Sequence, residues 1–121
     1  MILSYRDLRV WQKSMNLVTD VYKATESFPK DEMFGLSAQL RRAVVSVPSN
    51  IAEGSARKGK REPLNFLHIA KGSLAEATTQ LEIAKRLGFL SDESFENLIE
   101  KGETIAKMIN SLIMSLNRKE E

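Results

Sequence analysis

The side chains of this sequence that are best placed to do chemistry are a cluster of basic residues between positions 41 and 61. This segment holds six of them, namely Arg41, Arg42, Arg57, Lys58, Lys60 and Arg61. Such a cluster attracts the phosphate backbone of nucleic acids without reading the base sequence. Arg6 and Lys71 could add to it. The same charges could instead form an ordinary solvated surface, and the sequence leaves both interpretations open. Because no aromatic side chain is interleaved with them, we expect backbone or shape recognition rather than base stacking.

A phosphate-binding loop is a further interpretation of the same segment. The run from Gly54 to Lys60 matches the pattern G-x-x-x-x-G-K. The next residue is Arg61, where such a loop needs serine or threonine to hold Mg²⁺. A true phosphate loop also follows a strand, whereas this run follows a helical pattern. The sequence therefore argues against nucleotide hydrolysis.

Other catalytic or metal-binding constellations are scarce. The chain has no cysteine and one histidine, His68, which leaves no thiolate site and no multi-histidine site. His68 stands between two apolar residues of a helix, which favours a partly buried, hydrogen-bonded side chain over a ligand or general base. Glu53 and Glu76 could act as an acid–base pair only if the fold brought them together. The sequence thus predicts no enzyme, no metal and no cofactor.

The length and composition indicate a single globular domain. We expect this domain to span residues 1–121, with 42% apolar and 28% charged residues being ordinary for a soluble protein. No apolar run approaches the roughly 20 residues of a membrane helix, and the start of the chain lacks the features of a secretory signal. We therefore expect a cytoplasmic protein without membrane contact.

The net charge of +2 is unevenly distributed along the chain. Residues 31–61 carry six basic and three acidic groups, whereas residues 91–121 carry four basic and seven acidic groups.

Apolar periodicity predicts the helices that must position the basic cluster. We expect four, at about residues 5–27, 36–56, 62–87 and 92–116. No alternating pattern typical of strands occurs. Gly88 is suited to end the third helix and Ser91 to cap the fourth, and the short link between them predicts an antiparallel hairpin. The fold class is therefore all-α, an antiparallel up-down four-helix bundle.

The first predicted helix carries two apolar stripes. The longer stripe predicts the core face and consists of Leu8, Trp11, Met15, Val18, Tyr22 and Thr25. The second consists of Val10, Leu17, Val21 and Ala24, and it predicts a broad core face or a contact with another subunit. Ser4 is the predicted N-cap, with Leu3 and Leu8 as a hydrophobic staple.

Pro48 stands inside the second predicted helix. A proline there removes one hydrogen bond and clashes with the carbonyl four residues back, at a cost of roughly 3 kcal/mol. The chain could kink, or it could form two helices with Pro48 at the first position of the second. Because the apolar period continues across Pro48, we expect a continuous helix kinked at Pro48. Ser46, Ser49 and Asn50 could bond the backbone groups that the proline frees, and residues 54–60 are expected to form a loop.

Several motifs of this chain are typical of one known family. They occupy residues 5–13, 27–30, 35–43, 47–54, 66–76 and 87–90, and the most specific is Pro48-Ser-Asn-Ile-Ala-Glu-Gly54. With these motifs the chain resembles the four-helix-bundle family encoded in intervening sequences of bacterial 23S ribosomal RNA genes. The resemblance covers residues 4–116, with departures at Ser55-Ala56 and Pro63. It implies an all-α bundle that assembles into a ring, commonly a homopentamer. It also implies a relation to nucleic-acid-binding accessory proteins that work with reverse transcriptases in diversity-generating retroelements.

These observations lead to one hypothesis and one alternative. The hypothesis is a non-enzymatic homo-oligomeric bundle that binds structured RNA or DNA through the six basic residues. The alternative is a protein-interaction scaffold, or an accessory subunit for a reverse transcriptase or other RNA-processing enzyme. The two differ in salt dependence, because a contact made only with phosphates dissociates at high salt, whereas a stable protein complex survives.

Overall fold

The computed structural model describes residues 4–118 as four α-helices and two short 3-10 helices. In chain order these are η1 (Tyr5–Asp7), α1 (Arg9–Thr25), η2 (Lys30–Glu32), α2 (Leu36–Ser55), α3 (Arg61–Arg86) and α4 (Asp92–Arg118). Within this part of the chain there is no strand. The predicted all-α, four-helix fold class is therefore confirmed.

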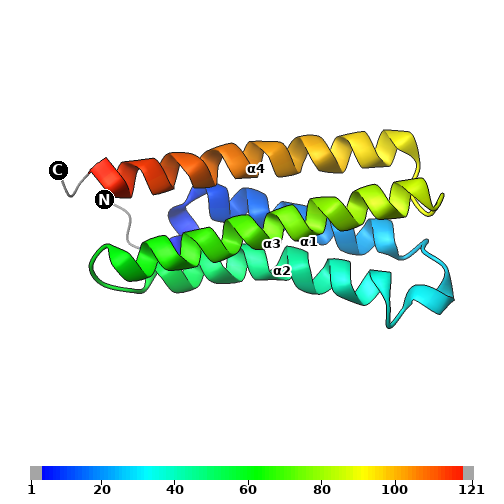
Figure 1. The fold of residues 1–121 in the computed structure, drawn as a ribbon, viewed down its shortest axis with the longest axis horizontal. Helices are drawn as coiled ribbons and strands as arrows, with labels where there is room; N and C mark the ends of the chain where they lie inside the picture. The colour runs from blue at the N-terminus through cyan, green and yellow to red at the C-terminus, as the bar shows by residue number, and fades with distance from the viewer. Residues whose placement is uncertain (1–3, 119–121) are drawn as a thin grey trace.

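The four helices lie side by side along one long axis, and the chain turns back at each connection (Figure 1). α2 contacts α1 and α3, and α4 contacts α3 and α1. Between the described residues no close backbone contact joins α1 to α3 or α2 to α4, so these are the diagonal pairs of the bundle. The start of α1, the α2–α3 turn and the end of α4 lie at one end of the bundle, and the α1–α2 and α3–α4 connections lie at the other (Figure 1).

The longer predicted stripe is not the most buried face of α1, although Leu8, Trp11 and Val18 of that stripe pack, partly buried, against the core, as a broad core face predicts. Val10, Ser14, Leu17, Val21 and Thr25 are buried, whereas Met15 and Tyr22 of the predicted core stripe are 39% and 40% exposed. The prediction followed apolar side chains alone, and Ser14 interrupts the true stripe. Its hydroxyl donates a 2.7 Å hydrogen bond to the Val10 carbonyl, which satisfies its burial.

The beginning of α1 also differs from the prediction. α1 starts at Arg9, and residues 5–7 form the separate η1 turn. Ser4 caps η1, because its hydroxyl accepts a 3.1 Å hydrogen bond from the Arg6 amide. The residue preceding α1 is Leu8, which has extended geometry and cannot cap with its side chain. The staple partner Leu3 lies outside the described residues.

α2 runs without interruption from Leu36 to Ser55 and buries Pro48 within it. The prediction of a continuous helix is confirmed, and the kink remains a prediction. Ser49 and Asn50 donate 2.8 Å side-chain hydrogen bonds to the carbonyls of Val45 and Ser46. These carbonyls directly follow that of Val44, which a proline at position 48 deprives of its usual donor. The Ser46 hydroxyl also shares a 2.8 Å hydrogen bond with Ser73, which joins α2 to α3.

The turn between α2 and α3 is tighter than the predicted loop and covers only residues 56–60. Gly54 is buried where the two helices meet. A Cβ atom at this position would lie 2.9 Å from the Phe66 Cβ and 3.4 Å from the Pro63 carbonyl oxygen. Gly59 has a φ of +77°, a left-handed conformation that glycine adopts without strain. These two glycines allow α2 and α3 to form a close hairpin.

The connection between α3 and α4 follows the prediction. Gly88 has a φ of +79° immediately after the C-cap Leu87. The Ser91 hydroxyl accepts a 3.1 Å hydrogen bond from the Ser94 amide and so caps α4. Phe89 packs against Phe28 with ring centroids 5.8 Å apart, which ties the two connections at this end together.

Candidate nucleic-acid interface

The structure does not bring all six predicted basic residues together. Arg57, Lys58 and Lys60 lie in the α2–α3 turn, and Arg61 is the first residue of α3. Arg41 and Arg42 lie inside α2. Because a helix rises about 1.5 Å per residue, Arg42 is roughly 20 Å along the axis from this turn.

Two further arginines join the turn from other parts of the chain. Arg6 lies in η1, which contacts α2, and Arg118 is the last described residue of α4, at the same end of the bundle (Figure 1). The Lys60 ammonium donates a 3.1 Å hydrogen bond to the Asn117 carbonyl and so links the turn to α4. We call Arg6, Arg57, Lys58, Lys60, Arg61 and Arg118 the basic end. Sequence analysis missed Arg118 because it stands in the acidic last segment, and the candidate Lys71 lies elsewhere, in a groove between α3 and α4.

Aromatic rings lie beneath two of these guanidinium groups. Arg6 stacks over Tyr5 and Trp11, 5.7 Å from each ring centroid. Arg57 lies 5.4 Å from the Phe66 centroid and forms a 3.1 Å ion pair with Glu53. Cation–π contacts of this kind restrain the guanidinium groups. The rings come from η1, α1 and α3, so a search within the basic segment of the sequence could not find them.

The two ends of the bundle carry opposite charge. Among residues 4–118, the acidic groups at the basic end are Asp7, Glu53 and Glu62, which leaves an excess of cations in this part of the chain. At the other end, Glu26, Asp31, Glu32, Asp92, Glu93 and Glu96 outnumber Lys30, Lys85 and Arg86. α3, with 26 residues, is roughly 39 Å long, several times the Debye length of about 8 Å at physiological salt. A polyanion at the basic end is therefore screened from the acidic end.

Arg41 has a structural role in joining α2 to α1. Its Nε atom donates a 2.8 Å hydrogen bond to the Thr25 hydroxyl, and its guanidinium lies 4.6 Å from the Tyr22 ring centroid. Arg42, by contrast, is exposed, and its side chain has no hydrogen bond, ion pair or ring contact with any residue from 4 to 118. The two adjacent arginines therefore have different environments.

The other candidate residues are not assembled into a catalytic site. His68 is exposed rather than partly buried, because it lies on the outer face of α3. Glu53 pairs with Arg57, while the Glu76 carboxylate accepts a 3.3 Å hydrogen bond from Gln80. Among residues 4–118 there is no cluster of three metal-ligating side chains, and no helix in that range has the length and hydrophobicity to cross a membrane.

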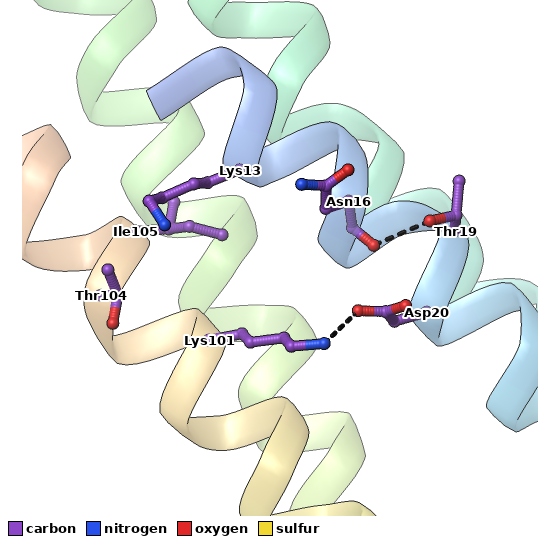
Figure 2. A pocket seen from close by; sticks show the side chains of 7 residues that line it. All are labelled: Lys13, Asn16, Thr19, Asp20, Lys101, Thr104 and Ile105. Carbon is purple, nitrogen blue, oxygen red and sulfur yellow. Dashed lines mark hydrogen bonds and ion pairs between the residues drawn. The ribbon is translucent and has the colours of Figure 1, made fainter. Parts of the chain in front are cut away.

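A small polar groove of about 340 Å³ lies between α1 and α4 (Figure 2). Its lining residues are Lys13, Asn16, Thr19, Asp20, Lys101, Thr104 and Ile105. Lys101 reaches from α4 to Asp20 of α1, with Nζ 2.5 Å from Oδ2 (Figure 2). The Thr19 hydroxyl donates to the Asn16 carbonyl of its own helix. The ion pair thus joins α1 to α4 at this groove.

Comparisons with known proteins place the chain in a family. Residues 6–111 match the family model described as 23S rRNA-intervening sequence protein. The fold is similar to the crystal structure of a protein with unknown function from the S23 ribosomal protein family of Bacteroides thetaiotaomicron. That similarity has a TM-score of 0.78 and 25% sequence identity, and it covers 86% of this chain and 97% of the other. A comparison with curated proteins finds no match.

Proposed function

The chain belongs to the 23S rRNA-intervening sequence protein family, and on this premise we propose that it is a non-enzymatic, homo-oligomeric helical bundle that binds structured RNA or DNA through its basic end. The observation that carries the proposal is the convergence of six cationic side chains from three separate segments of the chain on one end of the bundle. The opposite end is acidic, so a polyanion is attracted to one end only.

The chemistry of the basic end suits phosphate contacts. Lys58 and Arg61 are exposed and have no side-chain partner among the described residues. The guanidinium groups of Arg6 and Arg57 are held over aromatic rings. A restrained planar guanidinium can donate two parallel hydrogen bonds to a phosphate and loses little freedom on binding. This arrangement favours contact with the nucleic-acid backbone, with no reading of base sequence.

The proposal is tested by the affinity of the protein for a fluorescent RNA stem-loop and a DNA duplex, measured by anisotropy. The double variant Lys58→Glu/Arg61→Glu reverses two unpartnered charges at the basic end. The matched control, Lys23→Glu/Lys30→Glu, makes the same change in net charge on exposed residues toward the other end. At about 0.1 M salt we expect the first variant to bind at least about ten-fold more weakly and the control to change less than about two-fold.

Three results would contradict the proposal. If the wild-type protein binds neither probe, or if the two double variants bind equally well, the basic end is a solvated surface. If the protein is monomeric at every concentration, the homo-oligomeric part fails. A complex with another protein that persists in concentrated salt would instead favour the scaffold alternative.

A further inference from the structure

An exposed apolar surface lies over α1, α2 and the turn before α2. Phe34 is 91% exposed, Met33 is 57% exposed, and Tyr22 and Val45 are 40% and 38% exposed. With Ala38, Arg41, Arg42 and Ser46 they line a hollow of about 620 Å³. We call this surface the α1–α2 face. Monomeric proteins rarely leave contiguous apolar surface of this kind uncovered.

The α1–α2 face is held in place. The Glu32 carboxylate accepts a 3.1 Å hydrogen bond from the Leu36 amide and so anchors the turn on the first residue of α2. Phe34 therefore projects from a structured turn. Tyr22 is fixed by the guanidinium of Arg41 at 4.6 Å. An ordered turn beneath Phe34 and a restrained Tyr22 ring reduce the conformational freedom that the face loses on docking, which favours the use of these side chains as anchors.

A complementary groove lies on the opposite side of the bundle, between α3 and α4. Its cavity volume is about 770 Å³, and its apolar lining includes Leu74, Ile83, Phe95, Ile99 and Ala106. Gly102 lies in this groove, and a Cβ there would come within 3.2 Å of the Thr78 Cγ2, so the two helices approach closely at this level. We call this surface the α3–α4 groove.

The summed free charges of the two surfaces are opposite, because two carboxylates outnumber Lys71 in the groove. Glu96 and Glu103 line the groove, are exposed, and have no side-chain partner among residues 4–118. The other charges there are Glu82 and Arg86, which pair with each other at 3.0 Å, and Lys71. On the α1–α2 face the unpartnered charge is Arg42. A two-fold contact between α1–α2 faces would bring Arg42 against its own copy, whereas a head-to-tail contact brings it near carboxylates.

The charged residues of the two surfaces also lie at similar positions along the bundle axis. α2 and α4 both begin at the same end of the bundle (Figure 1). Measured from these starts, Arg42 is roughly 9 Å along the axis, and Glu96 and Glu103 are roughly 6 Å and 17 Å along. Two copies can therefore pair side by side with parallel axes.

We infer that a second copy of this chain inserts Phe34 of its α1–α2 face into the α3–α4 groove of the first, with its Arg42 beside Glu96 and Glu103. This inference rests on the homo-oligomer in the proposed function and names its interface. Because α1 and α2 lie opposite α3 and α4, each copy offers one surface of each kind and can contact two neighbours. Parallel docking turns every basic end to the same side of the assembly, where several can engage one nucleic acid.

The test uses two variants and their mixture, with mass measured by light scattering after gel filtration. Phe34→Ser removes the anchor, and Glu96→Lys/Glu103→Lys reverses the charge of the groove. We expect the wild-type protein to exceed the 13.6 kDa of one chain, and each variant to raise the dissociation constant at least about 30-fold. All altered side chains are exposed, so circular dichroism should show unchanged folding.

The equimolar mixture is the decisive measurement. A head-to-tail contact predicts a species of twice the chain mass that grows no further, since each variant retains the surface that the other lacks. In addition, Arg42→Glu alone should weaken assembly, and its combination with Glu96→Lys/Glu103→Lys should restore it. A wild-type oligomer unaffected by all these changes would overturn the interface and leave the homo-oligomer standing. A mixture that stays monomeric would also overturn it, whereas a monomeric wild type would overturn both.

Discussion

Gly54 and Phe66 meet so closely that a Cβ on Gly54 would lie 2.9 Å from the Cβ of Phe66. This contact closes the α2–α3 hairpin and sets the position of the turn that carries Arg57, Lys58 and Lys60. Phe66 has a second role, because its ring centroid lies 5.4 Å from the Arg57 guanidinium. The packing of two helices thus positions the basic end.

Gly54→Ala should destabilise the protein, although alanine is the better helix former. The atom that it would meet is fixed close to the backbone of α3, so the helices must separate, at a cost of about 1–3 kcal/mol. Gly72→Ala is the matched control, because a Cβ at that exposed helical site meets nothing within 4 Å. It should stabilise by about 0.5–1 kcal/mol. Chemical denaturation of both variants measures the two changes in unfolding free energy, which should have opposite signs. Equal changes would contradict the close contact between Gly54 and Phe66.

Leu17→Ala should cost about 2–5 kcal/mol of unfolding free energy, because Leu17 is buried in the core and the change leaves a cavity. Met15→Ala, two residues earlier on the partly exposed stripe, should cost less than about 1 kcal/mol. Urea denaturation at low protein concentration separates the two. If Met15→Ala destabilised the protein more than Leu17→Ala, the longer predicted stripe, and not the observed one, would face the core.

Arg41→Ala should destabilise the protein by about 1–2 kcal/mol, because it removes the hydrogen bond to Thr25 and the stacking on Tyr22. Arg42→Ala should change the stability of the dilute protein by less than about 0.5 kcal/mol, since Arg42 is exposed and unpartnered within the described chain. Thermal melts of the two variants at matched low concentration test this difference. Equal melting temperatures would rule out a structural role for Arg41.

The salt dependence of RNA binding should report the number of phosphate contacts. The slope of log K against log salt is negative, and each phosphate contact that is lost reduces its magnitude by about one. The variant Lys58→Glu/Arg61→Glu should therefore reduce the magnitude of the slope by about two. The control Lys23→Glu/Lys30→Glu should leave it unchanged. A reduced affinity with an unaltered slope would mean that Lys58 and Arg61 do not touch phosphate. Titrations at four or five salt concentrations provide the measurement.

The Asp20–Lys101 ion pair should contribute little to stability. Their side chains are 28% and 43% exposed, so solvent screens the pair, and a double-mutant cycle should give a coupling of about 0.2–1 kcal/mol. The coupling should shrink as salt is added. A coupling of several kcal/mol, or one insensitive to salt, would show that the groove between α1 and α4 is less open to water than its geometry indicates.

The sequence by itself determined the helices and much of how they end. Apolar residues three and four apart specify amphipathic helices wherever they occur, and Gly88 and Ser91 end and cap helices through their own backbone and hydroxyl chemistry. The continuity of α2 across Pro48 also followed from the sequence, because the apolar period on each side of Pro48 is in phase. These features depend on residues close together in the chain.

The tertiary structure alone decided which surfaces face the core and which charges meet. α1 carries two stripes of similar hydrophobicity, and only packing against α2 and α4 selected the one containing Ser14. The length of α2 separated Arg42 from Arg57, while the bundle brought Arg6 and Arg118 to the basic end from the two ends of the chain. Contacts between residues remote in sequence depend on how helices pack, and helical periodicity does not encode that packing.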